Sequence, residues 1–497
     1  PELINAGRTH GTREFMVYGE DRWSFARFFA TVDALAGRLQ QEHGLRQGER
    51  VAIALRNRPE WVVALVAVAL LGAVPAPLNS FGLGEELNAS LQYLQPRWLV
   101  CDQDRFDRLA QHPLPAGCQS TVVNGEQGSV PWHQLVAPGG PAFKPPALGP
   151  TDPALILFTS GASAQAKGVQ SNQRAICMTS PQAVQKLMAT GLTPTTLTVV
   201  PLFHVSGLHA QLLAALRHGR RLVLMHRWDP AQAMELIQRE QITQFNGAPS
   251  MVQQLLDQPS FHDPQANGAP MSLGFGGAGL SQRLIEATLA ARPDSLSGIG
   301  FGLTETNGVG AGASGTLFAL RPECAGMVSP LMELRIADVF GDPLPTGQDG
   351  EIWLRGVTVM DGYWNQPCAT QAAMSDGWFR TGDVGLIDGD GFLRIVDRIK
   401  DVINRNGEKI AAAEVESCLM QHGAVEDAVV FAQADEQTGE AVVAVVHLRT
   451  GAHASAQELR QHVADRLAAY KVPQTIHLRS ESLPRNPAGK LLKNALK

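Results

Sequence analysis

The chain has 497 residues, of which 44% are hydrophobic and 18% are charged, and its formal net charge is -6 at pH 7. A single core stops growing beyond roughly 250–300 residues, so this length predicts at least two domains. The composition is typical of a globular protein and excludes a disordered or fibrous one. The mild negative charge gives no electrostatic reason to expect nucleic acid or an anionic membrane as a partner, so a small-molecule ligand is expected.

The six cysteines are widely scattered, which predicts reduced thiols rather than a zinc site or a disulfide framework. The most apolar stretch, residues 61–74, is shorter than the ~18 to 20 residues of a membrane helix, so we expect a buried helix and no membrane span. The N-terminus lacks the basic region and apolar core of a secretory signal. We therefore expect a soluble, cytoplasmic protein, whose oligomeric state the sequence leaves open.

Helices alternate with short apolar strands in the first half of the chain. Helices are predicted at residues 24–41 and 59–71, strands at 51–55, 154–158, 197–200 and 221–225, and a turn at 75–80. The strands from residue 154 onward are each expected to be followed by a loop and a helix. This alternation predicts an α/β fold built on doubly wound sheets.

The pattern changes after residue 315, where short strands are separated by Gly and Asp turns. It predicts a small β subdomain over about residues 315–397. Beyond the charged stretch 398–401 the sequence predicts an independent α+β module. The expected organisation is a large N-terminal domain over 1–397, a hinge at 398–401 and a small C-terminal domain over 402–497.

A candidate phosphate-binding loop, residues 158–168, follows an apolar strand and is made of small and hydroxylated residues. It can present backbone N–H groups, the hydroxyls of Thr159, Ser160 and Ser163, and the ammonium of Lys167 to phosphate oxygens. It does not match the Walker A pattern, because a glycine follows the lysine where Ser or Thr is needed. A polar surface loop is the alternative interpretation.

A glycine cluster at Gly274, Gly276 and Gly279 has the spacing of a dinucleotide-binding fingerprint. The match lies in mid-chain rather than in a first βαβ unit, so it is weak evidence for a nicotinamide or flavin site. A close-packed turn between a strand and a loop is the stronger interpretation.

Two short motifs add carboxylates. Thr304 and Glu305 place a hydroxyl beside a carboxylate, which can bind Mg²⁺ on a nucleotide, although a helix cap explains the same residues. Residues 381–383 (Thr-Gly-Asp) are expected to form a turn in which Asp383 can accept hydrogen bonds from a ribose diol; an ordinary Asx turn is the alternative.

The order of these motifs along the chain is more informative than any one of them. The chain carries, in sequence, the loop ending in Lys167, Pro-Leu-Phe-His at 201–204, Thr-Glu at 304–305, Thr-Gly-Asp at 381–383, Arg-Ile-Lys-Asp at 398–401, Gly-Glu-Lys-Ile at 407–410 and Pro-Arg-Asn-Pro-Ala-Gly-Lys at 484–490. They resemble the successive core motifs of the adenylate-forming superfamily, which includes acyl- and aryl-CoA synthetases, peptide-synthetase adenylation domains and beetle luciferases. The similarity extends from about Trp23 to the end of the chain.

The resemblance implies an ATP-dependent ligase that converts a carboxylic acid into its acyl-adenylate, releases pyrophosphate and transfers the acyl group to coenzyme A. Two alternatives stay open: an enzyme that loads the phosphopantetheine of a carrier protein, and a nucleotide- and acid-binding protein without turnover. An amino-acid-activating domain would carry an aspartate near His204, and residues 203–207 contain none. This favours an acid without an α-amino group.

The resemblance also implies roles for individual residues. The catalytic set is Lys490, His204, Glu305 and Thr304, with Glu305 as the Mg²⁺ ligand. The residues implied to bind ATP or coenzyme A are Thr159, Ser160, Gly161, Ser163, Lys167, Gly276, Gly277, Ala278, Phe301, Gly302, Asp383, Arg398, Lys400 and Gly407.

In this family the C-terminal domain closes with its lysine inward for adenylation and then rotates to complete the thioester site. Lys490 would bridge the attacking carboxylate and the α-phosphate, because two anions approach each other there and positive charge must offset them. Lys400 would lie at the hinge, His204 at the carboxylate end of the acid pocket, and Gly407 beside the pantetheine tunnel.

The phosphate loop departs from the family pattern, because residues 162–166 are Ala-Ser-Ala-Gln-Ala where Thr-Thr-Gly-x-Pro is common. Replacing Ala164 by glycine and Ala166 by proline should lower the KM for ATP. Glycine tolerates a left-handed backbone, and proline reduces the entropy that the loop loses when it orders on the nucleotide. Steady-state kinetics at varied ATP measures the effect; an unchanged or higher KM would contradict this account.

Overall fold

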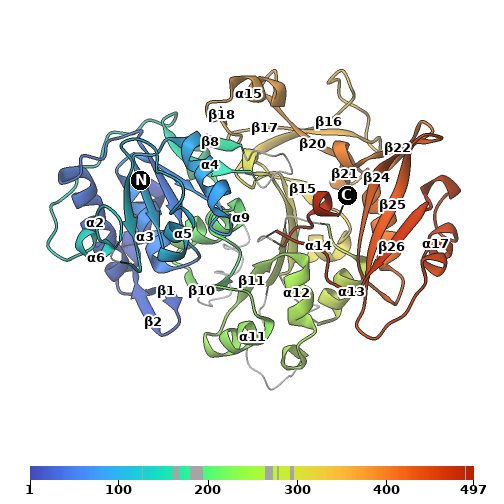
Figure 1. The fold of residues 1–497 in the computed structure, drawn as a ribbon, viewed down its shortest axis with the longest axis horizontal. Coiled ribbons are helices and arrows are strands. Elements are labelled where there is room, and N and C mark those ends of the chain that lie inside the picture. The colour runs from blue at the N-terminus through green and yellow to red at the C-terminus, as the bar shows by residue number, and fades with distance from the viewer. Residues whose placement is uncertain are drawn as a thin grey trace.

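Figure 1 shows a computed structural model of the chain, which describes residues 1–125, 127–159, 167–179, 194–262, 272–276, 279–291, 296–486 and 489–496. The large N-terminal part runs from blue to yellow, and the small C-terminal domain, in orange and red, lies at its side. This arrangement agrees with an α/β protein that has one large and one small domain.

The first layer is a parallel sheet with strand order β4-β3-β5-β6. Its strands are β3 (Arg50–Ala54), β4 (Val74–Pro77), β5 (Trp98–Cys101) and β6 (Gln119–Val122), and its helices include α2 (Phe25–Gln41) and α3 (Pro59–Leu70). The hydroxyl of Ser24 caps α2 by accepting a hydrogen bond from the backbone N–H of Arg27. As expected for an uninterrupted apolar stretch, α3 is almost entirely buried.

The turn predicted at residues 75–80 is wrong in its first part, because Pro75 and Pro77 lie in strand β4. Prolines cannot donate to a sheet ladder and are therefore tolerated mainly at sheet edges. Strand β4 is the edge strand of this sheet, so its two prolines interrupt no pairing on the outer side.

The expectation that each strand from residue 154 onward is followed by a helix is wrong for the first of them. Strand β7 (Pro153–Phe158) pairs antiparallel with the next strand, β8 (Gly168–Asn172), which also pairs with β18 (Gly362–Tyr363). The candidate phosphate loop thus connects two strands of one hairpin. Its residues 160–166 lie outside the described part of the chain.

A long second sheet continues through the N-terminal part and into the β subdomain. Its central parallel strands are β9 (Thr195–Thr198), β10 (Arg221–Leu224), β11 (Gln244–Gly247), β12 (Ser272–Gly276) and β13 (Gly298–Phe301). Helices α11 (Pro230–Arg239), α12 (Pro249–Leu256) and α13 (Gln282–Ala291) contribute to the apolar cluster that contains Leu197, Phe245 and Leu273. The carboxyl ends of the parallel strands therefore converge on one edge, where ligands bind in such sheets.

The β subdomain is built from antiparallel strands that extend the same sheet. They are β14 (Ala311–Ser314), β15 (Gly326–Val328), β16 (Met332–Ala337), β17 (Gly350–Gly356), β20 (Trp378–Ile387) and β21 (Phe392–Arg398). The turn expected at residues 381–383 lies inside β20 instead, next to an irregularity in its pairing with β17. Gly382 has φ of +71° at this point, so a kinked strand produces the local signal of a turn.

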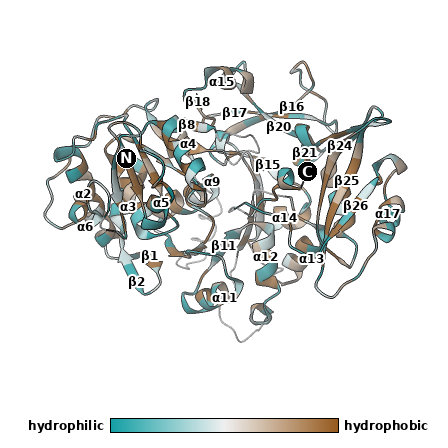
Figure 2. Ribbon diagram, viewed as in Figure 1, coloured by the Kyte–Doolittle hydropathy of each residue, from teal (hydrophilic) through white to brown (hydrophobic). Residues whose placement is uncertain are grey.

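The C-terminal domain has its own core between a sheet and two helices. Its elements are β22 (Ile403–Arg405), β23 (Glu408–Ile410), α16 (Ala412–Met420), β24 (Val425–Asp435), β25 (Gly439–Leu448), α17 (Ala456–Ala464) and β26 (Thr475–Arg479). Figure 2 shows hydrophobic residues along the length of β24 and β25. Val430, Val446 and Leu459 are among the buried members of this core. The short helix η5 (Ile399–Asp401) connects the domain to β21.

All six cysteines are free. Among the helices that the structure describes, none combines the length and the apolar character that crossing a membrane requires.

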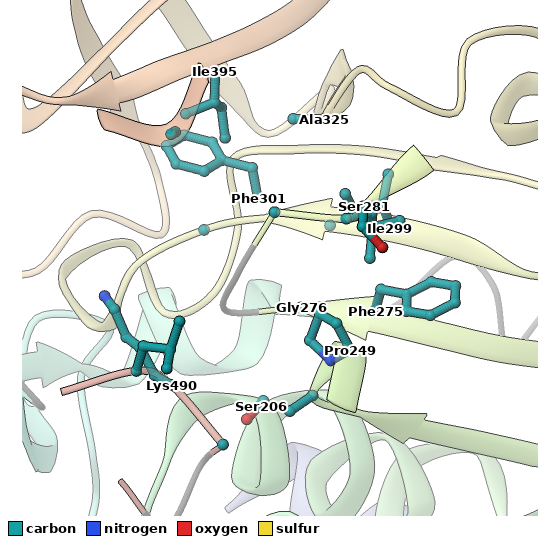
Figure 3. A pocket seen from close by; sticks show the side chains of 18 of the residues that line it. Ser206, Pro249, Phe275, Gly276, Ser281, Ile299, Phe301, Ala325, Ile395 and Lys490 are labelled. Carbon is teal, nitrogen blue, oxygen red and sulfur yellow. The ribbon is translucent and has the colours of Figure 1, made fainter. Parts of the chain in front are cut away.

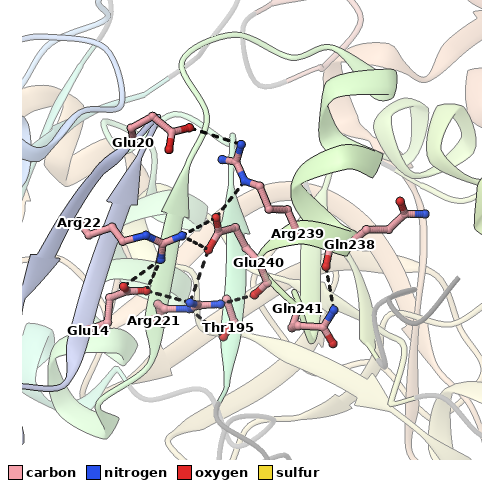
Figure 4. Close-up of polar contacts among 9 residues, drawn as sticks. All are labelled: Glu14, Glu20, Arg22, Thr195, Arg221, Gln238, Arg239, Glu240 and Gln241. Atoms are coloured by element: carbon pink, nitrogen blue, oxygen red, sulfur yellow. Dashed lines mark hydrogen bonds and ion pairs between the residues drawn. The ribbon is translucent and has the colours of Figure 1, made fainter.

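A buried carboxylate connects the outer strands of the second sheet to α11 (Figure 4). Glu240, 2% exposed, lies within 2.9 Å of Arg22, 3.1 Å of Arg239 and 3.5 Å of Arg221. Arg221 also contacts Glu14 at 2.8 Å. The strands β1 (Glu14–Tyr18) and β2 (Asp21–Ser24) are thereby fixed against β10.

Replacing Glu240 by glutamine should lower the free energy of unfolding by about 2 kcal/mol, because three arginines lose their shared carboxylate. The value stays below that of a fully buried pair since Arg22 and Arg239 are about half exposed. Glu20, 93% exposed, contacts the same Arg239 at 3.6 Å and provides the control Glu20→Gln, expected within about 0.5 kcal/mol of wild type. Urea denaturation followed by circular dichroism measures both, and equal effects would contradict this role.

Candidate active site

A cleft of about 3140 Å³ separates the N-terminal part from the C-terminal domain. It is several times larger than a pocket for one small ligand, roughly 300–1,000 Å³. The predicted site residues that line it are Thr159, Lys167, His204, Gly276, Phe301, Gly302, Thr304, Glu305, Asp383, Arg398, Lys400 and Lys490. Residues that are distant in the sequence therefore meet in one place, and Figure 3 shows part of this cleft.

Lys490 reaches the cleft from a tight loop of the C-terminal domain (Figure 3). Its backbone N–H donates to Oδ1 of Asn486 at 2.9 Å, and its carbonyl accepts from the backbone N–H of Asn486 at 2.8 Å. The guanidinium of Arg485 donates to the carbonyl of Gly489 at 2.7 Å. These contacts fix the backbone on both sides of the lysine.

Gly489 is the point where this loop meets the N-terminal part. A β-carbon at Gly489 would lie 2.4 Å from the β-carbon of Ala248, the residue that precedes α12. The φ of Gly489 is +81°, which L-residues rarely adopt. Glycine is therefore required here by the backbone and by the neighbouring domain at once.

Asp383 and Arg398 form an ion pair beside Lys490. They are opposite each other in β20 and β21, with Arg398 Nε 3.1 Å from Asp383 Oδ1. Burial raises the pKa of Asp383 although Arg398 opposes the shift. Burial also lowers the pKa of Lys490 to about 8, and the nearby charges of Arg398 and Lys400 act in the same direction. The charges around Lys490 are thus the cations Arg398 and Lys400 and the carboxylates Asp383 and Asp401.

Glu305 and Lys167 approach each other across Tyr363. The Tyr363 hydroxyl donates to Oε1 of Glu305 at 2.8 Å, and Lys167 Nζ lies 4.7 Å from the Tyr363 ring centroid. Burial and then the Glu305 charge raise the pKa of Tyr363, so it remains a neutral donor. The backbone of Thr159 donates to the Lys167 carbonyl at 3.0 Å, which closes the base of the candidate phosphate loop.

The short helix η4 (Thr304–Thr306) orients Thr304 and Glu305. Thr306 closes this turn with its hydroxyl, which accepts from the Leu303 backbone N–H at 3.1 Å. The buried Asn307 follows in a left-handed conformation and donates to Ser171 and to the Thr358 carbonyl, both at 2.9 Å. The alternative of a simple helix cap is not supported, because neither Thr304 nor Glu305 makes a side-chain cap.

His204 lies on the other wall of the cleft, directly before the short helix α9 (Val205–Gly207). The buried Asn57 fixes this segment by accepting from the Leu202 backbone N–H at 2.9 Å and donating to the Val200 carbonyl at 3.0 Å. Burial lowers the pKa of His204 to about 4, so its imidazole is neutral at physiological pH. The aromatic ring of Phe203 lies 4.4 Å from it, centroid to centroid.

A narrow apolar slot lies at the ends of β12 and β13. Figure 3 shows Phe301 beside Ile395 and across from Gly276. A β-carbon at Gly302 would lie 2.3 Å from the carbonyl oxygen of Gly308, so the chain can turn here only with glycine. An aromatic face bordered by glycine backbone suits a flat heterocycle.

Some predicted residues are elsewhere or are not described. Gly407 lies at the turn between β22 and β23, is exposed and does not line the cleft. Lys400 is exposed at the margin, in η5. Ser160, Gly161, Ser163, Gly277 and Ala278 lie outside the described residues.

The structure adds two residues that sequence analysis missed, Tyr363 and Asn57. The pairing of β18 with β8 brings Tyr363 to the site, and no local sequence pattern predicts that pairing. Asn57 acts through the backbone of the His204 segment and lies far from it in sequence. An isolated polar residue after an apolar strand was the available signal for Asn57.

Glu305 is the residue expected to bind a metal ion. Within the described ranges no group of three or more His, Cys, Asp or Glu side chains is arranged to hold one. A single carboxylate nevertheless fits Mg²⁺, which usually takes one or two protein carboxylates and completes its shell with water and phosphate oxygens.

A cleft between a large α/β domain and a small domain, with cations and a carboxylate around a flat apolar slot, defines a nucleotide-binding protein of two domains. The AMP-binding enzyme family model matches residues 4–364, and the model of the AMP-binding enzyme C-terminal domain matches residues 414–490. The chain therefore belongs to the adenylate-forming AMP-binding enzyme superfamily.

The relatives of the chain include several CoA ligases. A feruloyl-CoA synthase from Amycolatopsis sp is 32% identical over 97% of this chain and 94% of its own length. An indoleacetate–CoA ligase from Aromatoleum aromaticum is 32% identical over 95% of this chain and 92% of its own length. The solved o-succinylbenzoate CoA synthetase (MenE) from Bacillus subtilis, in complex with its acyl-adenylate intermediate, has a TM-score of 0.86 and 28% identity and covers 100% of this chain and 97% of its own. Adenylate formation and CoA ligation are thus properties of proteins to which this chain is similar.

The two lysines of the C-terminal loop should titrate differently. Lys490 loses its charge as the pH rises through about 8, because burial lowers its pKa. Burial acts against the charge of Lys493 too, but its ion pair with Glu416 at 2.8 Å outweighs that effect and raises the pKa above its usual value. Acetylation at a series of pH values, quantified by mass spectrometry, should show Lys490 half-reactive near pH 8 and Lys493 only at higher pH. Identical profiles would contradict this electrostatic picture.

Proposed function

We propose that the protein is an AMP-forming acyl- or aryl-CoA ligase: it joins a carboxylic acid to ATP as an acyl-adenylate, releases pyrophosphate and transfers the acyl group to coenzyme A. The observation that carries this proposal is the position of Lys490, next to the Asp383–Arg398 pair and on the same cleft as Glu305 and His204. The CoA ligases among the relatives support the thiol acceptor.

The nucleotide is proposed to lie across the cleft from the apolar slot to the phosphate loop. The adenine would occupy the slot beside Phe301, and the ribose hydroxyls would donate to Asp383, which its ion pair with Arg398 orients. Lys167 and Thr159 would bind the β- and γ-phosphates. Mg²⁺, when bound at Glu305, would supply charge neutralisation for the phosphates.

Lys490 is proposed to act at the reacting centre. The substrate carboxylate attacks the α-phosphate, forming an acyl–phosphate bond while the bond to pyrophosphate breaks, so negative charge accumulates between two anions. A cation at this point stabilises the transition state more than the separated reactants. Lys490 is charged below pH 8, and an anionic ligand raises its pKa further, because opposite charges favour the protonated form.

The acid is proposed to enter beside His204. Its neutral imidazole lines the wall without repelling or strongly attracting the carboxylate. An amino acid would need a carboxylate for its ammonium group, and residues 203–207 provide none. The proposed substrate is therefore a carboxylic acid without an α-amino group.

Thioester formation requires a different arrangement of the C-terminal domain. In this structure Lys490 faces the cleft, whereas Gly407 is exposed outside it. A rotation about residues 398–401 would exchange the two, and the exposed position of Lys400 in η5 is compatible with a hinge. We assign this arrangement to the adenylation step of the proposed cycle.

The proposal is tested by exchange of labelled pyrophosphate into ATP with a panel of aliphatic and aromatic acids, followed by thioester detection after addition of coenzyme A. Exchange that depends on the acid, together with an acyl-CoA product, supports the proposal. If acid-dependent exchange occurs but the thioester forms only on a phosphopantetheinylated carrier protein, the acceptor is that carrier protein and not coenzyme A. Nucleotide binding without exchange for every acid would indicate a binding protein.

Lys490→Ala should slow acyl-adenylate formation by about 100-fold or more, because one transition-state donor is lost. Conversion of a supplied acyl-adenylate to the thioester should stay near the wild-type rate, since Lys490 would point away from the site in that step. Lys144→Ala, an exposed lysine that does not line the cleft, is the control for both half-reactions. Equal losses in the two half-reactions of Lys490→Ala would contradict domain alternation in this protein.

A further inference from the structure

The central parallel strands present very different residues on their two faces. Phe245 is paired with Leu197 on one side and with Leu273 on the other, so these three residues share one face of the sheet and pack into a hydrophobic core. The opposite face of the same strands carries the small or polar residues Thr196, Thr198, Gln244, Asn246, Ser272, Gly274, Gly298 and Gly300. Several of them line the cleft, including Gln244, Asn246 and Ser272. The cleft therefore extends along a polar sheet face, down from the end where His204 lies.

Arg220 is buried at the deep end of this polar face, with no exposed surface. Its Nη1 donates to Oγ1 of Thr196 at 3.1 Å. Nε and Nη2 have no hydrogen-bond partner in the part of the chain that the structure describes, yet the residue lines the cleft. Among the ion pairs of the described residues, none involves Arg220.

The neighbouring Arg221, the first residue of β10, shows how a cation is compensated at this point of the chain. Arg221 contacts Glu14 at 2.8 Å and the buried Glu240 at 3.5 Å, and it donates to the Glu240 carbonyl (Figure 4). Arg220 directly precedes β10, and its side chain lies on the face of Thr196 instead. Arg221 therefore meets two carboxylates, whereas Arg220 lines the cleft with two nitrogens that have no partner among the described residues.

Two other buried polar side chains on this part of the cleft also have unused hydrogen-bonding atoms. His209 is 4% exposed, its Nδ1 lies 3.3 Å from the Thr179 hydroxyl, and its Nε2 has no partner in the described residues. Gln244 is 6% exposed and its Oε1 is likewise unpaired there. Burial lowers the pKa of Arg220 only to about 10, so the guanidinium is still charged at neutral pH.

A buried cation without a partner destabilises a protein, since its lost hydration is not replaced. Buried polar groups in native proteins are nearly always satisfied, so each exception calls for a partner such as water, an ion or a ligand. A ligand group that accepts hydrogen bonds from Nε and Nη2 of Arg220 would satisfy both, because a carboxylate matches the guanidinium fork.

The position of Arg220 sets the distance between the two ends of such a ligand. Thr196 and Gln244 are paired at the amino ends of their strands, whereas His204, Gly276 and Phe301 lie at or beyond the carboxyl ends. A strand of this length, with about 3.3 Å per residue, separates these ends by about 10 Å. A molecule with its reacting carboxylate near His204 would place its far end close to Arg220.

We propose that the acid activated by this protein is a dicarboxylic acid, with one carboxylate at the reacting centre and a second, about 10 Å away, paired with Arg220. The proposal rests on the function proposed above and names the substrate class of the same site. Gln244 and His209 supply further hydrogen bonds around the second carboxylate. Arg220 is a specificity-determining residue in this scheme and takes no part in the reaction.

The test compares acids that differ only in the second carboxylate: octanoate with octanedioate, and 3-phenylpropanoate with 3-(4-carboxyphenyl)propanoate. Acid-dependent pyrophosphate exchange gives kcat/KM for each, and isothermal titration calorimetry without ATP gives their affinities. Wild type should favour the diacid of at least one pair by about 30-fold or more, the usual effect of a lost partner in a buried charge pair.

Arg220→Met removes the charge and keeps a side chain of similar length. It should abolish the preference for the diacid while leaving the KM for ATP unchanged, and Arg220→Lys should retain part of the preference. Arg221→Met is the matched control: it breaks the ion pairs with Glu14 and Glu240 and should lower the Tm without changing acid selectivity. Arg220→Met should instead leave the Tm unchanged or raise it, since an uncompensated buried charge is removed.

The outcomes separate this inference from the proposed function. Exchange with monoacids and no preference for diacids in either pair would overturn the role of Arg220 and leave the ligase proposal intact. A preference for diacids that survives in Arg220→Met would overturn it as well. If neither acid class supports exchange, the ligase proposal fails, and calorimetry still decides whether diacids bind through Arg220.

Discussion

The close packing of the C-terminal loop on the N-terminal part is the contact on which the site depends. Gly489 approaches Ala248 so closely that any β-carbon would collide with it. The local charges by themselves give no comparable constraint, because Asp383 attracts Lys490 whereas Arg398 and Lys400 repel it. Steric fit therefore holds the partly buried Lys490 at a point where nearby charges both attract and repel its ammonium group. Nucleotide phosphates that bind here would be attracted by each of these cations and would offset the repulsion among them.

Asp383 and Glu305, the two carboxylates proposed to bind the nucleotide and its metal ion, are held in different ways, which suits different tasks. Asp383 is buried and paired with one guanidinium, so its orientation is fixed by the pairing of β20 with β21. Glu305 accepts from the neutral Tyr363 hydroxyl and lies in a turn that Asn307 supports. Among the described residues Glu305 forms no ion pair, so its oxygens can bind a metal ion, whereas a carboxylate already paired with arginine is better suited to accept bonds from neutral hydroxyls.

The residues that line the cleft are easier to find in the sequence than the strand pairings that support them. The motifs around Lys490, Asp383 and Glu305 are contiguous, and each contributes its side chain from one short loop or strand, so the sequence identifies them directly. The antiparallel pairing of β7 with β8 and the strand at Pro75 depend on partners far along the chain, which local patterns do not specify. Tyr363 was missed for the same reason, because long-range strand pairing alone brings it to Glu305.

The groups proposed to react and those proposed to select the acid lie at opposite ends of the same strands. The carboxyl ends are where Gly276 and Phe301 border the cleft. The residues that would distinguish one acid from another lie within or beside the strands, at the amino ends, and have the alternation of an ordinary half-buried strand. In sequence, Gly-Arg-Arg-Leu-Val-Leu at 219–224 gives no reason to separate Arg220 from Arg221. Only the folded structure shows that Arg221 pairs with Glu14 and Glu240, whereas Nε and Nη2 of Arg220 have no partner among the described residues.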